Sequence, residues 1–309
     1  MLRAGLLWLS EQPQIFRFVR RNGLARRFAS RFVAGETVES AVAALRDLNA
    51  GRLSASLDLL GESVLHAEEA HHARDTYLET LDRIRAAGAD ANVSVKLTQM
   101  GLDIDESLCV ANLRAIIGKA KTHGSFVRID MEGSAYTERT LELFTTQFHP
   151  EFGDTVGVVL QSYLRRTEGD VANMIALGAR VRLCKGAYQE TADVAFPNKK
   201  DVDANYVACM ERLLERGNYP AIATHDPRII AHAKAFATRR GIAPVRFEFQ
   251  MLFGVRRDLQ RALRRNGYRI RVYVPFGTQW YSYLMRRLAE RPANIAFVLS
   301  NIVKESLRR

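Results

Sequence analysis

The sequence has few cysteines and no long apolar run, and both absences narrow the classes of protein it can belong to. Its three cysteines, Cys109, Cys184 and Cys209, are scattered through 309 residues, which excludes a disulfide framework and suits a reducing compartment. No apolar stretch approaches the roughly 20 residues of a spanning helix. The phosphate-binding patterns G-x-G-x-x-G and G-x-x-x-x-G-K-[ST] are missing, and no Cys/His spacing resembles a zinc module.

Acidic residues are scarce relative to basic ones, because 34 Asp/Glu face 45 Lys/Arg for a net charge of +11. The excess lies at the two ends: residues 1–34 hold seven arginines and one glutamate (net +6), and residues 255–309 hold thirteen Lys/Arg and three Asp/Glu (net +10). This distribution favours an anionic partner, either lipid or nucleic acid, although a solubilising surface explains it equally well. The arginine-rich N-terminus is typical of a transit peptide or of a pair of amphipathic helices.

Short β-branched or apolar runs alternate with longer helix-like stretches along the chain. Eight runs are predicted as strands: Ser56–Leu60, Val93–Leu97, Phe126–Asp130, Val156–Leu160, Arg180–Leu183, Ala221–Thr224, Arg246–Phe249 and Ile270–Val274. The predicted helices include Val110–His123, Arg139–Gln147, Asp201–Arg216, Asp226–Arg240 and Arg257–Asn266. Such alternation indicates an α/β fold with parallel strands. Eight units in this length favour a (β/α)₈ TIM-type barrel over a doubly wound sheet.

Polar side chains recur where the predicted strands end, and in a barrel those ends form the active-site face. The set comprises Glu62, Lys96, Asp130, Gln161, Arg182, Lys185, Thr224, His225, Gln250 and Tyr273, and the apolar Leu252 lies beside Gln250 at the end of the seventh run. Strands buried on both faces are normally apolar, so this enrichment predicts a ligand site.

The fifth run, VRLCKGAY at residues 181–188, carries the most specific local pattern. Arg182 and Cys184 share one face of the strand, with Leu183 opposite. An arginine inside a barrel requires an anion or another acceptor. Lys185 followed by Gly186 suits a phosphate or a flavin, because the glycine allows close backbone approach. Lys185 could instead form a Schiff base with a carbonyl substrate.

A helix predicted near the C-terminus, within YSYLMRRLAERPAN at residues 281–294, places Tyr283, Arg286, Arg287 and Glu290 on one face. Two arginines beside a tyrosine would form a carboxylate clamp with an aromatic wall. A solvated helix with an Arg286–Glu290 pair is the alternative, and for this segment alone it is the stronger interpretation.

Asp130 is predicted as a carboxylate inside the barrel, paired with an arginine of that last helix or with Lys96, although an acid at a strand end often caps a helix instead. Thr224 and His225 indicate either a cofactor contact or hydrogen-bonded core residues. The run HAEEAHH at residues 66–72 is interpreted as a solvated helix without bound metal, because H-E-x-x-H is absent.

Eight motifs in order then mark a resemblance over nearly the whole chain, from about Arg31 to Phe297: SVKLTQMG, RIDMEG, VVLQSY, VRLCKGAY, ATHD, FEFQMLFG, RVYVPFG and YLMRRLAERPAN. Together they resemble the proline dehydrogenase family, in its short, monofunctional bacterial form. The resemblance implies a distorted (β/α)₈ barrel over residues 41–309, an N-terminal helical arm over residues 1–40, and a last helix packed over the barrel mouth. It implies non-covalent FAD and oxidation of L-proline to Δ1-pyrroline-5-carboxylate, with electrons passing to a membrane quinone.

The resemblance also implies roles for individual residues. Arg286 and Arg287, assisted by Lys96, would bind the proline carboxylate, and Asp130 would orient this cationic group. The wall around the proline ring would comprise Tyr188, Leu252, Tyr273 and Tyr283. Glu62 would pair with Arg286 as a gate, and Glu290 would help to offset the arginine charges. FAD would contact Met131, Gln161, Arg182, Lys185, Gly186, Ala187, Thr224 and His225. Arg182 would favour the reduced flavin, and the substrate amine would lose its proton to a tyrosine or a water.

The implied partners and location follow the same resemblance. We expect a cytoplasmic enzyme held peripherally at the inner membrane through anionic lipid, without nucleic acid. A separate pyrroline-5-carboxylate dehydrogenase would use the product, since no second catalytic domain is recognisable. Two other hypotheses stay open on the residues alone. One is a Schiff-base aldolase using Lys185 or Lys96, and the other is a basic binding protein on an inactive barrel.

Overall fold

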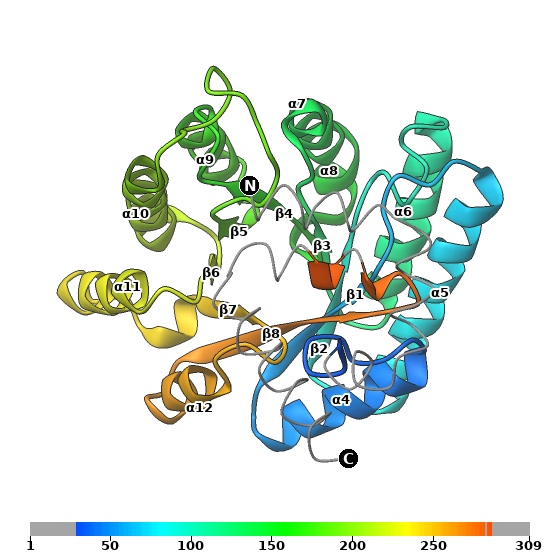
Figure 1. Ribbon diagram of the computed structural model, residues 1–309, viewed down its shortest axis with the longest axis horizontal. Coiled ribbons are helices and arrows are strands. Elements are labelled where there is room, and N and C mark those ends of the chain that lie inside the picture. The colour runs from blue at the N-terminus through cyan, green and yellow to red at the C-terminus, as the bar shows by residue number, and fades with distance from the viewer. Residues whose placement is uncertain (1–28, 282, 286–309) are drawn as a thin grey trace, which may run out of the picture.

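The computed structural model describes residues 29–281 and 283–285. Eight parallel strands close into a barrel in sequence order, each hydrogen-bonded to the next, and the eighth pairs with the first (Figure 1). The strands are β1 (Ser54–Leu59), β2 (Ala91–Val95), β3 (Val127–Ile129), β4 (Val156–Gln161), β5 (Arg180–Cys184), β6 (Ala221–Ala223), β7 (Glu248–Leu252) and β8 (Arg269–Phe276). The predicted (β/α)₈ barrel is therefore confirmed.

Alternation along the strands divides the side chains between two environments. In the paired register, Leu57 lies beside Val93, and Val93 lies beside Val127. All three are fully buried and belong to the apolar layer between the strands and the helices. The intervening positions point into the barrel, where the Ser56 and Ser94 hydroxyl oxygens lie 2.9 Å apart. Because the inward row is polar, the barrel interior is built for interactions with charged groups.

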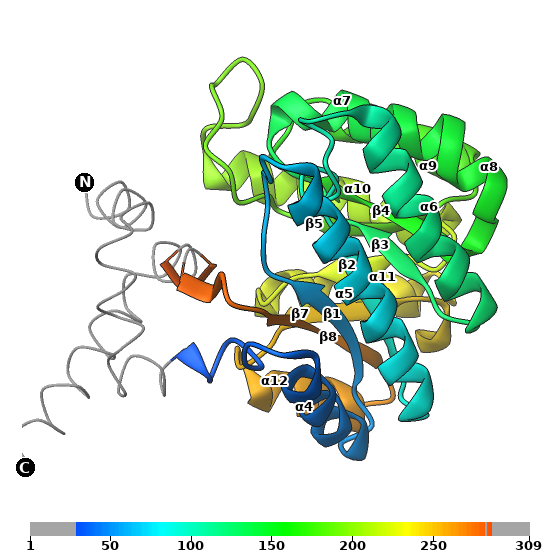
Figure 2. The ribbon, with the colours of Figure 1, turned by 90° about the vertical axis from the view of Figure 1, so that its right-hand side faces the viewer.

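Helices surround the barrel and connect the strands (Figures 1 and 2). They are α4 (Val38–Ala50), α5 (Ala67–Ala86), α6 (Glu106–Thr122), α7 (Ser134–Leu143), α8 (His149–Phe152), α9 (Thr167–Ala176), α10 (Lys199–Arg216), α11 (Pro227–Arg239) and α12 (Arg257–Arg265). Local signals set several helix starts: the side chains of Thr37, Asp105 and Asp226 accept hydrogen bonds from first-turn amides of α4, α6 and α11. Within the described residues, no helix has the length and apolarity needed to cross a membrane.

Several predicted boundaries are shifted by a few residues, and two of the shifts are informative. The strand expected at Arg246–Phe249 begins at Glu248 and continues to Leu252, because Pro244–Arg246 forms a short 3-10 turn. The helix expected at Arg139–Gln147 begins at Ser134, leaves α geometry after Leu143, and continues as a π turn over Phe144–Phe148. Both errors come from reading periodicity across a turn that changes the residue spacing.

The first and last described residues pack together near Leu60, just after β1. Ala29 and Val33 are buried in a small cluster with Trp280, Tyr283 and neighbouring side chains, and the Trp280 indole donates to a Glu36 carboxylate oxygen at 2.9 Å. Most of the predicted arm (residues 1–28) and the predicted last helix beyond Met285 lie outside the described residues.

Candidate active site

A cavity of about 950 Å³ opens at the carboxyl ends of the strands. Every strand, or the residue directly after it, contributes to its lining. The described residues predicted from the sequence all line this one cavity: Glu62, Lys96, Asp130, Met131, Gln161, Arg182, Lys185, Gly186, Ala187, Tyr188, Thr224, His225, Leu252, Tyr273 and Tyr283. Their convergence confirms that these positions share one site, whereas their individual roles stay predictions. Arg286, Arg287 and Glu290 lie outside the described residues.

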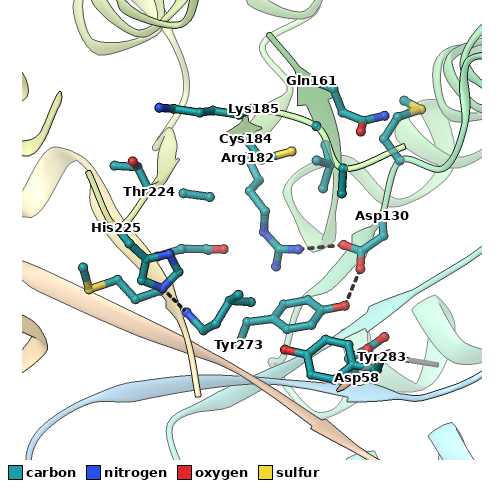
Figure 3. A pocket seen from close by; sticks show the side chains of 18 of the residues that line it. Asp58, Asp130, Gln161, Arg182, Cys184, Lys185, Thr224, His225, Tyr273 and Tyr283 are labelled. Atoms are coloured by element: carbon teal, nitrogen blue, oxygen red, sulfur yellow. Dashed lines mark hydrogen bonds and ion pairs between the residues drawn. The ribbon is translucent and has the colours of Figure 1, made fainter. Parts of the chain in front are cut away.

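Asp130, directly after β3, is the centre of the charge network on the cavity floor (Figure 3). Its Oδ1 accepts from Arg182 Nη1 at 2.6 Å, and its Oδ2 accepts from the Tyr273 hydroxyl at 2.7 Å. Lys96 Nζ is farther away, at 3.9 Å from Oδ2. The expected pairing with Lys96 is therefore only peripheral, and Arg182 is the main partner within the described residues. Asp130 thus provides the anion that the sequence analysis required for the buried Arg182.

Arg182, on β5, is held in place from several sides. Only 5% of the residue is exposed. Its Nη2 donates to the Ser94 hydroxyl at 2.9 Å, and its guanidinium lies 5.2 Å from the centre of the Tyr273 ring. Its Nε is buried without a hydrogen-bond partner in the described structure. A fixed cation with one unused donor at the cavity floor is suited to a ligand that accepts hydrogen bonds.

Lys96 and Asp58 form a second ion pair in the cavity, with Nζ and Oδ1 2.7 Å apart. Burial opposes the charge on Lys96, but the carboxylates of Asp58 and Asp130 outweigh that cost and raise its pKa well above the usual value. The two carboxylates therefore favour the protonated form of Lys96. This argues against the Schiff-base hypothesis for Lys96, because a nucleophilic lysine must lose its proton.

Sequence reasoning missed Asp58, which lies within β1 and is 1% exposed. A charged residue inside the apolar run SASLDLL was the available signal, because a buried acid needs a partner. The partner lies 38 residues away, and the pairing of β1 with β2 brings the two together.

Tyr273, on β8, stays protonated. Burial and the neighbouring Asp130 carboxylate raise its pKa well above the ordinary value. Its proton is already donated to Asp130. Tyr273 is thus a fixed hydrogen-bond donor, and of the two proton acceptors considered for the substrate amine, this tyrosine is disfavoured.

The segment after β5 lies against the cavity wall. Gly186 has a φ of +104°, and a Cβ at this position would stand 2.2 Å from the Tyr163 ring, so only glycine fits. Lys185 Nζ lies 2.5 Å from Asp203 and 3.3 Å from Asp226. These contacts place a cation and an accessible main chain beside the cavity.

His225, which follows the neighbouring strand β6, has a defined hydrogen-bonding role. The Leu252 amide donates to its Nε2 at 2.9 Å (Figure 3). Nε2 is therefore the acceptor, and in the neutral ring the proton is on Nδ1. Thr224 accepts from the Asp226 amide at 3.0 Å, at the start of α11. The ATHD segment is thus pre-organised by backbone contacts.

No group of three or more His, Cys, Asp or Glu side chains within the described residues is arranged to hold a metal ion. His66 precedes α5, and His71 and His72 are exposed on its first two turns.

Comparisons with known proteins agree with this geometry. The family model described as "Proline dehydrogenase" matches residues 41–300. "Proline dehydrogenase 1" of Bacillus subtilis is 43% identical over 305 residues, covering 99% of this chain and 100% of the relative. "Proline dehydrogenase" of Deinococcus radiodurans is 44% identical over 308 residues, covering 98% of both chains.

A solved structure of similar fold is proline utilization A from Bdellovibrio bacteriovorus, inactivated by N-propargylglycine. The TM-score is 0.81 at 27% identity, over 92% of this chain. This chain spans 38% of the length of that larger protein, so the likeness concerns one part of it.

Proposed function

This chain belongs to the proline dehydrogenase family, and from that premise we propose that it oxidises L-proline to Δ1-pyrroline-5-carboxylate with FAD bound in the strand-end cavity. One observation supports the assignment most strongly. A single cavity brings together the cation Lys96, the Asp130–Arg182 ion pair and the donor Tyr273. A small amino acid needs a cation to bind its carboxylate. Its oxidation also needs a redox cofactor in the same cavity, since no side chain can accept a hydride.

The lining fits FAD in three respects. The volume of about 950 Å³ lies near the upper end of the usual range for ligand pockets, roughly 300–1,000 Å³. Gly186 lines the cavity, and its positive φ and its packing against Tyr163 exclude a side chain at this position. Within the described residues, the buried Nε of Arg182 has no hydrogen-bond acceptor. We propose that Arg182, Lys185, Gly186, Ala187, Thr224, His225, Met131 and Gln161 hold the cofactor.

When bound, FAD would supply the acceptor for the hydride from the carbon beside the proline nitrogen, and would pass electrons to a membrane quinone. The chain's own residues would position the reactants. Lys96 would bind the substrate carboxylate, together with Arg286 and Arg287. Asp130 holds Arg182 at the floor, where its positive charge would favour a negatively charged reduced cofactor.

Proline would lie against an apolar wall. The rings of Tyr273, Tyr283 and Tyr188 and the side chain of Leu252 line the same cavity as Lys96, so a ring substrate could contact them while its carboxylate meets the cation. Glu62 also lines the cavity, and we propose that it pairs with Arg286 over the bound substrate. Fixing the ring by its carboxylate is a positioning effect on the rate.

The proton on the substrate nitrogen would leave to water. Tyr273 is unsuited to accept it because its pKa is raised by burial and by Asp130. The product would pass to a separate enzyme that oxidises the derived aldehyde, and the acceptor quinone would be reached by peripheral contact with an anionic membrane.

The direct test is to supply the purified chain with FAD and L-proline and a soluble dye as electron acceptor. Dye reduction should depend on both FAD and L-proline, and the imine product should be trapped by ortho-aminobenzaldehyde. Dye reduction without trapped imine would contradict the proposed product, and no FAD dependence would contradict the cofactor.

A further inference from the structure

A series of hydrogen bonds joins the segments after β1, β2 and β3 to the end of β4. Thr98, in the turn after β2, is fully buried, and its Oγ1 accepts from the Ser63 amide at 2.9 Å. The same hydroxyl donates to Glu132 Oε1 at 2.5 Å, and the Thr98 amide donates to Glu132 Oε2 at 3.1 Å. The Glu132 carbonyl oxygen accepts from Gln161 Nε2 at 2.8 Å. We call this series the loop-linking network.

The network adjoins residues of the proposed site without forming part of the cavity wall. Ser63 directly follows Glu62, and Thr98 lies two residues after Lys96. Glu62 and Lys96 line the cavity. Ser63, Thr98 and Glu132 are not among the described residues that line it. These three residues can therefore affect a ligand only through the residues that they hold in place.

The turn at Ser63 depends on the network for its conformation. Its φ is +52°, a left-handed conformation that non-glycine residues rarely adopt unless their surroundings fix it. Ser63 is exposed, so packing contributes little. Two hydrogen bonds to Thr98 hold the turn instead, one from the Ser63 amide and one from the Val64 amide to the Thr98 carbonyl at 3.4 Å. Removing the Thr98 hydroxyl would let the turn relax, and Glu62, one residue earlier, would move with it.

Glu132 is a buried acid whose side chain serves this contact. The residue is 4% exposed, and both carboxylate oxygens accept from Thr98. Burial raises the pKa of Glu132, and the two Thr98 donors oppose that rise. An amide at this position would place an NH₂ group against one of the two donors. The site therefore suits a carboxylate specifically, although burying one is costly.

We propose that Thr98 and Glu132 are positioning residues that set the placement of Glu62 at the cavity and, through it, the affinity for the substrate. This inference rests on the proposed function, in which Glu62 pairs with Arg286 over bound proline. Such a pair holds the substrate only if Glu62 is kept at a fixed place. Because the network ends on Gln161, it holds Glu62 relative to a residue that is proposed to contact FAD.

The test replaces Thr98 in two ways and uses a matched control. Thr98→Val removes the hydroxyl with little change in shape, and Thr98→Ser keeps a hydroxyl. The control is Thr80→Val in α5, because Thr80 is also fully buried and its hydroxyl donates to the Thr76 carbonyl of the same helix at 2.7 Å. Both valine variants lose one buried hydroxyl, but only the Thr98 hydroxyl belongs to the network. Thermal unfolding of each variant checks that it folds.

Steady-state kinetics of the FAD-loaded variants are measured with L-proline and a soluble dye. We expect Thr98→Val to raise the KM for L-proline about tenfold, the effect of one lost hydrogen bond, with kcat within about twofold of wild type and FAD retained. Thr98→Ser should keep a KM close to wild type, and so should Thr80→Val. Glu132→Gln should raise the KM as Thr98→Val does.

A double-mutant cycle shows whether the effect passes through Glu62. Glu62→Ala should itself raise the KM, and Thr98→Val should then add less than about twofold, because the residue that it positions is already lost. The proposal would be overturned by a full effect of Thr98→Val in the Glu62→Ala background. A wild-type KM in Thr98→Val or Glu62→Ala, or equal KM increases in Thr98→Val and Thr80→Val, would overturn it as well.

Hydrogen exchange followed by mass spectrometry tests the network without substrate. Peptides that cover residues 60–68 should exchange faster in Thr98→Val than in the wild-type chain or in Thr80→Val, because the Ser63 amide loses its acceptor. Unchanged exchange would overturn the proposal. Failure of the wild-type chain to reduce the dye with L-proline would contradict the proposed function, whereas the exchange result would still decide whether Thr98 holds the turn.

Discussion

Replacing Lys96 by methionine separates the role of this cation in substrate binding from its role in folding. The Lys96 ammonium lies 2.7 Å from Asp58 and 3.9 Å from Asp130. If it binds the proline carboxylate, its loss removes a charge-assisted hydrogen bond, worth about 1.5–3 kcal/mol. The KM for L-proline should then rise by roughly tenfold to a hundredfold.

The same substitution should destabilise the fold in a pH-dependent way. Asp58 would become a buried acid without its cation, and breaking a buried pair from one side costs about 3–5 kcal/mol. Burial already raises the pKa of Asp58, and loss of Lys96 raises it further. A group with a raised pKa in the folded state is tolerated while it is protonated. The loss of stability should therefore be small at acidic pH, grow as pH rises above the ordinary carboxyl pKa, and level off above the raised pKa of the folded state.

The double variant Lys96→Met/Asp58→Asn separates the two effects. Without the buried charge, the free energy of unfolding in urea should recover most of the loss. It should also become nearly independent of pH between about pH 5 and pH 8, the range in which proteins are usually most stable. Its KM should stay high. A KM close to wild type in the double variant would refute the assignment of Lys96 to the substrate carboxylate. If the free energy of unfolding of the single variant were the same at about pH 5 and pH 8, the ion-pair reasoning would be refuted.

Three further substitutions test other parts of the site. Gly186→Ala should weaken FAD binding and lower the melting temperature, because its Cβ would stand 2.2 Å from the Tyr163 ring; unchanged flavin retention on gel filtration would contradict this. Tyr273→Phe removes the hydrogen bond to Asp130 and should lower kcat/KM by about tenfold, for a loss near 1.4 kcal/mol, with flavin retained; wild-type kinetics would show that the bond is dispensable. Arg287→Met should raise the KM for proline strongly with flavin still bound, and normal proline affinity would exclude this residue from the clamp.

The architecture was predictable from the sequence because two simple periodicities carry it. Runs such as Val156–Leu160 are short and apolar, and the stretches between them have helical spacing, so eight parallel strands followed directly. Because parallel strands place their carboxyl ends at one face, residues as distant in sequence as Lys96 and Tyr273 could be assigned to the same site. The barrel then confirmed that they line one cavity.

The pairing inside the cavity was not predictable in the same way. Asp130 was expected to meet Lys96 or an arginine of the last helix, but it meets Arg182, 52 residues away. Asp58 was missed because its position within a strand resembles a packing position, and its importance comes from a contact with Lys96, which follows the neighbouring strand β2. Distances between inward side chains depend on how the closed barrel sets the strand register, and no local pattern in the sequence contains that information.

The most direct test of the central claim is the visible absorption spectrum of the FAD-loaded protein, recorded without oxygen before and after addition of L-proline. The account predicts an oxidised flavin spectrum that bleaches with L-proline. A flavin spectrum that L-proline leaves unchanged would contradict proline as the substrate, and a protein that stays colourless after reconstitution with FAD would contradict the flavin site itself.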